Sequence, residues 1–307
     1  MQHATEWKRR LKELTGGKVL FDECMDRHTS IGVGGGADAL VFPESVAELG
    51  KLVAMMRAEG IPVLFVGNGT NLIVRDDGFR GVIISTKGLR AVRIETRGED
   101  RAAILAEAGA SLAEVVALTA REALTGMEFC AGIPGSVGGG IRMNAGAYGS
   151  ELKDVIESVS LLNGEGNIKS CQREALQFQY RNLALPEGSC VAGGVFVLAR
   201  GSREAVEGRI REILRTRTGK HPLDYRNAGS IFKNPKGMPA GKLIDEAGLK
   251  GARIGGAQVS EKHGNFIVNL GSATAKDIIG LIELVQKKVL ETTGIALEPE
   301  VKIIGEE

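Results

Sequence analysis

One segment of this chain is dominated by glycine, and its residue types suit the binding of an anion. Residues 132–149 contain seven glycines, no acidic side chain and a single base, Arg142. Glycine has no Cβ, so a ligand can approach its backbone closely, and successive free amides form a concave, partly positive nest. Such a nest would fit the pyrophosphate of a large cofactor. Taken alone, the segment is equally typical of tight turns in a β-rich fold, and that alternative stays open.

Two further glycine-rich stretches lie upstream, at 32–37 and 67–71. None of the three stretches matches a named phosphate-binding fingerprint, because the chain has neither G-x-x-x-x-G-K-[ST] nor a G-x-G-x-x-G followed by an acidic residue about twenty positions later. A P-loop NTPase and a Rossmann dehydrogenase are therefore both disfavoured. We interpret the stretches as loops from two subdomains that wrap one extended dinucleotide.

The last third of the chain contains polar clusters next to glycine or proline, at 228–234, 262–265 and 297–302. In the first cluster the hydroxyl of Ser230 could point into a cleft, with Lys233 and Asn234 supplying a cation and an amide. The simpler alternative makes Ser230 a turn residue, because serine is a common turn former. Likewise the C-terminal glutamates and Arg181 would most simply be solvated surface residues.

Composition limits the classes of protein to which the chain can belong. Of its 307 residues, 43% are hydrophobic and 25% are charged, as in a globular protein of two or three domains. The 39 basic and 38 acidic side chains nearly cancel, so the overall charge does not favour nucleic acid or an anionic membrane as a partner. The 43 glycines are about twice the usual share of about 7%, which indicates unusual demands on backbone geometry.

Cysteine, histidine and apolar residues indicate neither a metal site nor a membrane segment. The four cysteines are far apart and the four histidines form no H-x-x-x-H pattern, which argues against structural zinc. Scattered thiols fit a reducing compartment, residues 1–10 lack the apolar core of a signal peptide, and no apolar run reaches transmembrane length. We therefore expect a cytoplasmic protein without a metal.

Helix and strand patterns alternate along the chain, as in an α+β protein. Two capping boxes, Ser45 with Glu48 and Ser111 with Glu114, each precede a helix with one apolar stripe, and the second helix should end near 125–126. Capping boxes satisfy backbone donors at a helix start, so both pairs predict where a helix begins.

The remaining elements follow from periodicity and from helix stop signals. Helices are expected at 202–220, 240–247 and 274–293, and strands at 61–66, 81–85, 102–106, 155–162, 190–198 and 265–269. The last helix should be closed by Gly294. Glu300 alternates with apolar neighbours and is expected on a further strand.

Taken together, several motifs resemble those of one known family. They lie at 28–35, 67–72, 126–128, 132–139, 143–149, 180–181, 228–235 and 297–301. In this order they resemble the UDP-N-acetylenolpyruvoylglucosamine reductases (UDP-N-acetylmuramate dehydrogenases), flavoenzymes of peptidoglycan precursor synthesis. The resemblance implies an α+β fold with a two-lobed FAD-binding domain of the vanillyl-alcohol oxidase and p-cresol methylhydroxylase type. That domain would cover 1–201, with lobes at about 1–86 and 87–201, and a smaller α+β substrate-binding domain would cover 202–307.

The resemblance also implies which residues bind the cofactor and the substrates. FAD would be held by the glycine stretches, through Gly67, Asn68, Gly69, Thr70, Asn71, Gly132, Gly135, Ser136, Gly138, Gly139, Asn144 and Gly146. NADPH would give a hydride to the flavin and then be replaced at the same site by the enolpyruvyl ether of UDP-N-acetylglucosamine. The implied substrate contacts are Tyr148, Lys220, Lys233, Asn234 and Lys302.

Three residues match the catalytic positions of the family. Arg181 and Glu300 would bind and polarise the substrate carboxylate, where negative charge develops during the reaction. A carboxyl group can act there only when protonated, so Glu300 should keep its proton in a dry site. Ser230 would donate a proton to the α-carbon, helped by a nearby cation such as Lys220 or Lys233.

Two features depart from the family pattern. The longer branch of the family inserts a loop whose tyrosine covers the substrate, whereas here a short segment, 182–189, leads directly to the strand that begins at Cys190. The chain therefore resembles the shorter branch. Lys302 stands where arginine is usual, and a lysine offers a point charge without the bidentate fork of a guanidinium.

The expected protein is an NADPH-dependent, FAD-containing oxidoreductase that makes UDP-N-acetylmuramate and so serves cell wall biogenesis, cell shape and cell division. We expect it to act as a monomer, with small molecules as its only partners. A related FAD-dependent oxidase of the same fold with another substrate is the nearest alternative. A flavin- or nucleotide-binding regulator and a nucleic-acid-binding module are the others, the last weakened by the balanced charge and by an aromatic content of 4%.

Overall fold

The computed structural model describes residues 2–16 and 18–306, and the chain divides into two compact units. Unit 1 comprises Met1–Phe21, Ala39–Asn68 and Gly81–Arg215, and unit 2 comprises Asp22–Asp38, Gly69–Arg80 and Thr216–Glu307. Each unit is therefore assembled from three separate stretches of chain. The expected division at 201/202 concerns cofactor and substrate domains and stays a prediction.

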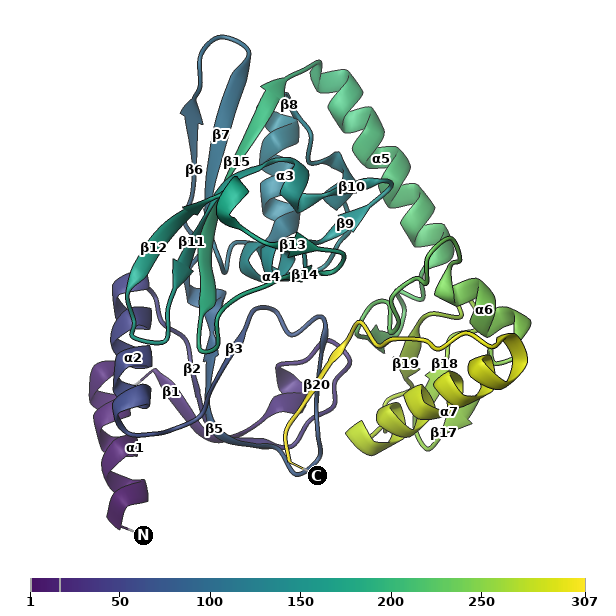
Figure 1. Ribbon diagram of the computed structural model, residues 1–307, viewed down its shortest axis with the longest axis horizontal. Helices are drawn as coiled ribbons and strands as arrows, with labels where there is room; N and C mark the ends of the chain where they lie inside the picture. The colour runs from purple at the N-terminus through teal and green to yellow at the C-terminus, as the bar shows by residue number, and fades with distance from the viewer. Residues whose placement is uncertain (1, 17, 307) are drawn as a thin grey trace. The chain divides into compact units, whose positions relative to one another are not determined.

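Helices and strands alternate along the described chain, as Figure 1 shows. The α-helices are α1 (Gln2–Leu14), α2 (Val46–Ala58), α3 (Leu112–Arg121), α4 (Val137–Arg142), α5 (Arg203–Lys220), α6 (Ala240–Glu246) and α7 (Ala275–Thr293). The first strands are β1 (Val19–Cys24), β2 (Gly36–Val41), β3 (Val63–Val66), β4 (Leu72–Val74), β5 (Phe79–Ser85), β6 (Val92–Thr96), β7 (Arg101–Glu107), β8 (Leu124–Thr125), β9 (Gly146–Ala147) and β10 (Ser150–Glu151). The later strands are β11 (Ile156–Leu162), β12 (Ile168–Gln172), β13 (Phe178–Gln179), β14 (Asn182–Leu183), β15 (Cys190–Arg200), β16 (Arg226–Asn227), β17 (Arg253–Ile254), β18 (Ala257–Val259), β19 (Ile267–Asn269) and β20 (Lys302–Ile304).

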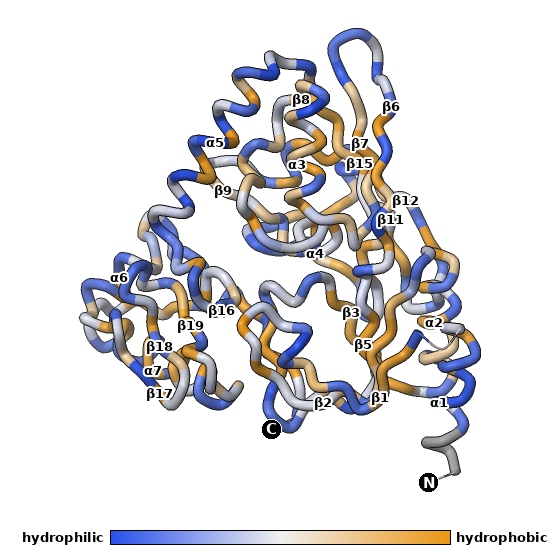
Figure 2. The backbone as a smooth tube through the Cα atoms, turned by 180° about the vertical axis from the view of Figure 1, so that it is seen from behind, coloured by the Kyte–Doolittle hydropathy of each residue, from blue (hydrophilic) through white to orange (hydrophobic). Residues whose placement is uncertain are grey.

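The main sheet of unit 1 is antiparallel, with the strand order β12-β11-β15-β7-β6 and β8 paired to β15. Helices α3 and α4 bury apolar side chains with this sheet, among them Val115, Ile141 and Phe196. The apolar residues of α3 recur every three or four positions, which places them on one face of the helix. In Figure 2, β7 is largely hydrophobic, whereas α5 is mostly hydrophilic and buries only Val206 and Ile213.

A second sheet has the strand order β1-β2-β5-β3, with β3 parallel to β5. In unit 1, the apolar face of α2 packs in one cluster with Val82 and Ile84 of β5. The predicted start of α2 is confirmed, because Ser45 Oγ accepts a hydrogen bond from Glu48 N at 3.1 Å. The Glu48 carboxylate accepts from Glu44 N at 2.8 Å, one residue before the expected partner.

Unit 2 contains an antiparallel sheet with the order β16-β19-β18-β17, together with α6 and α7. Its core joins α7 to β18 and β19 through residues such as Ile278, Val259 and Ile267. Helix α7 begins with a capping box between Thr274 and Asp277. It ends at a left-handed Gly294, as predicted. Strand β20 pairs in parallel with β4.

The structure corrects three expectations about local structure. Ser111 makes no side-chain cap to α3, because its backbone forms a bridge with Ser136 and Leu112 N donates to Gly135 O at 3.1 Å. The helix ends at Arg121, before the predicted end. The long glycine segment is not a continuous loop, since it contains α4.

A further correction concerns Glu300, which lies just before β20 and outside any strand. Leu297 and Val301 are buried, but Pro299 and Glu300 are both half-buried, so the expected alternation does not extend to Glu300. Among the described residues, no helix is both long and apolar enough to cross a membrane.

Candidate active site

In unit 1, two of the glycine stretches lie directly against each other. Gly67 follows β3, and a Cβ placed on it would come within 2.4 Å of Ser136 Oγ. Ser136 is buried and caps α4 by accepting from Gly139 N at 3.3 Å. The structure therefore brings Gly67 and Ser136 together, and Asn68, beside Gly67, is half-buried.

In unit 2, the rest of the 67–71 stretch contacts other predicted motifs. Gly69 has φ +67°, and a Cβ there would lie 2.1 Å from His28 O, so only glycine fits. Thr70 is half-buried. The side-chain amide of Asn71 donates to Glu300 O at 3.1 Å, and Lys302 N donates to Asn71 O at 3.0 Å. A predicted cofactor segment is thus joined to the predicted catalytic glutamate.

The glycines of α4 divide into those that packing requires and one that it does not. A Cβ on Gly138 would lie 2.7 Å from Ala108 Cβ, and one on Gly140 would lie 3.1 Å from side-chain atoms of Leu112 and Leu152. Gly139 is exposed, and its Cβ would meet only Ser136 Oγ at 3.5 Å. The protein itself therefore leaves room for a side chain at 139. Close approach of a cofactor would explain why this position has none.

Other glycines of the segment serve the turns around α4. Gly132 and Gly135 have φ +72° and +130°, which favours glycine at both positions. A Cβ on Gly146 would lie 2.5 Å from Ser150 O across the β9–β10 pair. At Gly138 and Gly146, close packing within the protein is enough to explain why the residue is glycine.

Asn144 uses its side chain to hold unit 1 together. It is fully buried with φ +42°, its amide donates to Glu151 Oε2 at 2.9 Å and to Gln179 O at 3.1 Å, and its Oδ1 accepts from Lys153 N at 3.1 Å. Both amide protons are therefore engaged within the protein. If Asn144 binds the cofactor as predicted, it must do so through its backbone, because its side chain is occupied.

The hairpin of β9 and β10 presents Tyr148 at its tip. Tyr148 and Gly149 both have positive φ, of 55° and 86°, as in the two-residue turns that suit a hairpin. The ring of Tyr148 is 47% exposed, and the guanidinium of Arg209 lies 5.7 Å from its centre. An exposed aromatic ring with a cation against its face can serve as a contact for a ligand.

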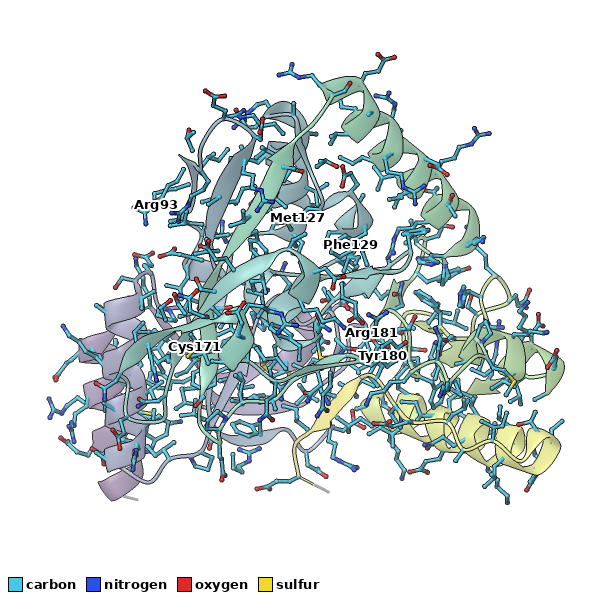
Figure 3. All side chains as sticks on the ribbon, turned by 45° about the horizontal axis from the view of Figure 1, so that its top comes forward. Arg93, Met127, Phe129, Cys171, Tyr180 and Arg181 are labelled. Atoms are coloured by element: carbon cyan, nitrogen blue, oxygen red, sulfur yellow. The ribbon has the colours of Figure 1, made fainter. Side chains whose placement is uncertain are left out.

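Arg181 lies at the tip of a second hairpin, β13–β14, which the glycine segment anchors. Its φ is +56°, and its guanidinium lies 5.0 Å from the ring centre of Tyr180. Figure 3 labels these two residues next to each other. One strand is held by the Asn144 side chain, and Arg142 binds Asn182 and donates to the backbone O of Leu183 at 2.7 Å in the other. A strained conformation persists only where its surroundings fix it, and these anchors do so.

Arg142, the one base of the glycine segment, has a structural role. Its side chain is occupied by the β14 strand, and burial lowers the pKa of its guanidinium. It is therefore engaged in fixing the hairpin of Arg181.

In unit 2, Ser230 and Glu300 are joined through a single residue, Ile231. Glu300 N donates to Ile231 O at 2.7 Å, and Phe232 forms an antiparallel bridge with Pro299. Ser230 is half-buried and directly precedes Ile231. The structure thus brings together two of the three predicted catalytic residues, whereas Arg181 belongs to unit 1.

The predicted substrate contacts of unit 2 differ in how much they are engaged. Lys233 pairs with Glu298, and Asn234 Oδ1 accepts from Ala240 N at 2.9 Å at the start of α6. Lys220, at the end of α5, and Lys302, on β20, have exposed side chains. The two exposed lysines are the more available cations for an anionic ligand.

Asn265 was not among the predicted site residues; it is 4% exposed, and its side chain bonds both the backbone N and the backbone O of Phe232. The motif at 262–265 was visible as a polar cluster, but its contact with residues 231–232 is made across more than thirty positions. The signal that the sequence offered was an asparagine between a glycine and an apolar run.

The chain belongs to a known class of cofactor-binding proteins. Residues 37–172 match the model of the family described as "FAD binding domain". The predicted α+β fold with an FAD-binding domain is confirmed, and the chain is an oxidoreductase with FAD as its cofactor. The glycine cradle around Gly139 fits such a group.

The C-terminal part of the chain matches one particular family of enzymes. Residues 221–304 match the model "UDP-N-acetylenolpyruvoylglucosamine reductase, C-terminal domain". The chain is 52% identical over 98% of its length to a protein of that name from Syntrophus aciditrophicus, of which it covers 96%, and 48% identical over 97% to one from Caldanaerobacter subterraneus, of which it covers 97%. The chain belongs to the UDP-N-acetylenolpyruvoylglucosamine reductase family, as its motifs predicted.

A solved structure supports the same assignment. The crystal structure of the reductase from Thermus caldophilus is similar to this chain with a TM-score of 0.79 and 36% sequence identity, over 93% of this chain and 97% of that one. The fold and the family are therefore established together.

Proposed function

We propose that this protein reduces UDP-N-acetylglucosamine enolpyruvate to UDP-N-acetylmuramate, with NADPH as the hydride donor and FAD as the carrier, as a monomer in the cytoplasm. Membership of the family supports a role in peptidoglycan synthesis. The single observation that carries the proposal is the hydrogen bond from Glu300 N to Ile231 O, which holds two polar groups of the proposed chemistry on adjoining backbone.

The overall change is the addition of two hydrogens across a carbon–carbon double bond. FAD held by the glycine stretches would supply hydride transfer between NADPH and the β-carbon of the enolpyruvyl group. A proton must then reach the α-carbon, and the Ser230 hydroxyl is the donor that we assign to it. The serine oxygen regains a proton from solvent, so NADPH and one proton are consumed for each product.

The role of Arg181 and Glu300 is to stabilise charge on the substrate carboxylate. As the hydride arrives, electron density moves toward the α-carbon and the carboxylate, and hydrogen-bond donors fixed in advance stabilise that charge best. Arg181 offers a planar set of N–H donors on an anchored hairpin tip. A protonated Glu300 would supply one more donor.

The proposed contacts of FAD lie in the glycine stretches, at Gly67, Asn68, Gly69, Thr70, Asn71, Gly132, Gly135, Ser136, Gly138, Gly139, Asn144 and Gly146. The contact of Gly67 with Ser136 and the open backbone at Gly139 support this set. For the substrate we propose Tyr148, Lys220, Lys233, Asn234 and Lys302. The exposed Tyr148 ring and the exposed lysines support it.

The test is the visible spectrum of the purified holoprotein without oxygen. Addition of NADPH should bleach the flavin bands, and subsequent addition of UDP-N-acetylglucosamine enolpyruvate should restore them. Bleaching without recovery would contradict the proposed acceptor while keeping the flavoprotein class. Rapid recovery with oxygen alone would favour a related oxidase.

A further inference from the structure

The cluster at 262–265 has no part in the chemistry described so far, yet its last residue is bonded to the Ser230 segment. Asn265 lies between β18 and β19 and is 4% exposed. Its Oδ1 accepts from Phe232 N at 2.9 Å, and its amide donates to Phe232 O at 2.8 Å. The side chain thus pairs with both polar groups of one residue, as a neighbouring strand would.

The backbone of Asn265 extends this pairing by one residue. Ile231 N donates to Asn265 O at 2.9 Å, so Asn265 makes three hydrogen bonds to two consecutive residues. Each fixes a different polar group of the backbone that directly follows Ser230. Together they leave the main chain at 231–232 little freedom to rotate.

The same short segment is bonded on its other side by the strand of Glu300. Glu300 N donates to Ile231 O at 2.7 Å, and Lys233 N donates to Glu298 O at 2.9 Å. The segment 231–233 therefore lies between Asn265 and 298–300. Movement of Asn265 would displace Ser230 and Glu300 relative to each other.

Asn265 is itself held by its neighbours. Its backbone N donates to His263 Nδ1 at 3.2 Å, so this nitrogen must be unprotonated. Phe266, next in the chain, packs against the rings of His221 and His263, each with its centre 4.9 Å away. An anchor that positions other groups has to be rigid, and these contacts make it so.

We propose that Asn265 is a positioning residue for the protonation step, because it sets the backbone that carries Ser230 against the backbone of Glu300. The inference rests on the proposed function above. It does not make Asn265 a catalytic residue, since its side chain is fully occupied by Phe232. The loop between β18 and β19 would thus contribute to the second half-reaction, in which the substrate reoxidises the flavin.

The test compares Asn265→Ala with Asn269→Ala. Asn269 is the matched control, because it is a buried asparagine of the same unit, 6% exposed. Its side chain makes four hydrogen bonds to the backbone, and none of them involves 230–233. Asn265→Ala should slow reoxidation of the reduced holoenzyme by UDP-N-acetylglucosamine enolpyruvate by about 100-fold while reduction by NADPH changes less than about threefold, as expected for a displaced reacting group. Asn269→Ala should not change the ratio of the two rates.

A conservative variant keeps the test decisive if Asn265→Ala does not yield holoprotein. In Asn265→Asp a protonated carboxyl can still accept from Phe232 N and donate to Phe232 O, whereas an ionised one cannot donate. The reoxidation defect of this variant should therefore shrink as the pH falls. A defect independent of pH, or one equal in both half-reactions, would overturn the role of Asn265.

A measurement without turnover checks the structural part of the inference. Amide hydrogen exchange in the peptide that contains 231–233 should become at least tenfold faster in Asn265→Ala and remain unchanged in Asn269→Ala. Unchanged exchange in both variants would overturn the inference. Failure of the wild-type flavin to be reoxidised by the substrate would instead contradict the proposed function, so the two failures are distinguishable.

Discussion

The side-chain amide of Asn71 donates to the backbone oxygen of Glu300 at 3.1 Å, across 229 positions of sequence. Asn71 ends a glycine-rich stretch whose residue types suit a cofactor, and Glu300 lies in a motif whose residue types suit a substrate. The adjoining backbone repeats the link, because Lys302 N donates to Asn71 O at 3.0 Å. Any shift of the glycine stretch at Asn71 is therefore transmitted to the backbone of Glu300.

The contrast between two neighbouring glycines gives a test of the cofactor cradle. Gly139→Ala should leave the apoprotein as stable as before, or up to about 1 kcal/mol more stable, because the position is helical and open. It should weaken FAD binding at least tenfold, as a methyl group would occupy the approach to the backbone. Apoprotein melting and quenching of flavin fluorescence on binding would measure both effects.

Two controls belong to that experiment. Gly138→Ala should destabilise the apoprotein by about 1–3 kcal/mol, because its Cβ would overlap Ala108. Gly219→Ala, at an equally open position of α5, should likewise raise apoprotein stability by up to about 1 kcal/mol but should leave FAD binding unchanged. Full FAD affinity in Gly139→Ala would contradict the cradle.

Ser230→Ala separates the two half-reactions. The hydroxyl is proposed only for protonation of the α-carbon, so flavin reduction by NADPH should stay nearly intact. Reoxidation by the enolpyruvyl substrate should slow by several orders of magnitude, which anaerobic stopped-flow absorbance would resolve. Equal losses in both half-reactions would remove Ser230 from the role of acid.

For Glu300, two substitutions distinguish a hydrogen-bond donor from a negative charge. Glu300→Gln should keep much of the hydrogen bonding of a protonated carboxyl and lose far less activity than Glu300→Ala. Rates of reoxidation for the two variants, each with its melting temperature, would provide the comparison. Indistinguishable losses would count against a neutral, donating Glu300.

His221 should make the stability of the protein depend on pH. Burial, followed by the charges of Arg217, His263 and nearby lysines, lowers the pKa of His221 to about 4, against 6.5 for a free side chain. Between these values the unfolded chain binds a proton that the folded one does not, so the free energy of unfolding should fall as the pH falls from about 6.5 to about 4. Urea unfolding at several pH values would measure the decline.

The matched variant for this prediction is His221→Phe, which keeps a ring beside Phe266. His263 titrates in both proteins, and burial lowers its pKa too, so the relevant quantity is the difference between the two pH slopes. The variant should lose less stability on acidification than the wild type. Parallel curves would show that the pKa of His221 is the same in the folded and unfolded states, and would contradict the prediction.

The cysteines should differ sharply in reactivity. Cys190 is 5% exposed within an apolar cluster, and burial raises the pKa of its thiol to about 12, whereas Cys24 is exposed. At pH 8 iodoacetamide should label Cys24 in the folded protein and Cys190 only after unfolding, because the thiolate is the reactive form. Peptide mass mapping, with Cys24→Ser as the control, would decide. Equal labelling rates would contradict the buried position.

The regular elements could be predicted because each depends on a local pattern. The apolar stripe of α2, its capping Ser45 and the left-handed Gly294 after α7 each depend on a few neighbouring residues. Helix α4 was missed because glycine has a low helix propensity, and it forms because Gly138 and Gly140 let it pack closely against Ala108, Leu112 and Leu152. The expected cap at Ser111 failed for a similar reason, since tertiary pairing with Ser136 took its place.

The candidate site was predictable in its residue types and not in its connections. Ser230 and Glu300 could be singled out from the motifs, but their link through Ile231 depends on a hydrogen bond between segments about seventy positions apart. The hydrogen bonds of the Asn144 side chain to Gln179 and Glu151 could not be predicted either, because no local pattern shows them. These contacts depend on hydrogen bonds between segments far apart in the sequence, which local patterns do not show.

The core of unit 2 includes Ile31, Val33 and Ile73, which come from far upstream of the C-terminal family domain. Strand β20 likewise requires β4 as its parallel partner. The C-terminal part therefore cannot be exchanged between relatives simply by joining two chains near residue 216. A chimaera that keeps its hydrophobic interior intact must take 22–38 and 69–80 from the same parent as the C-terminal part.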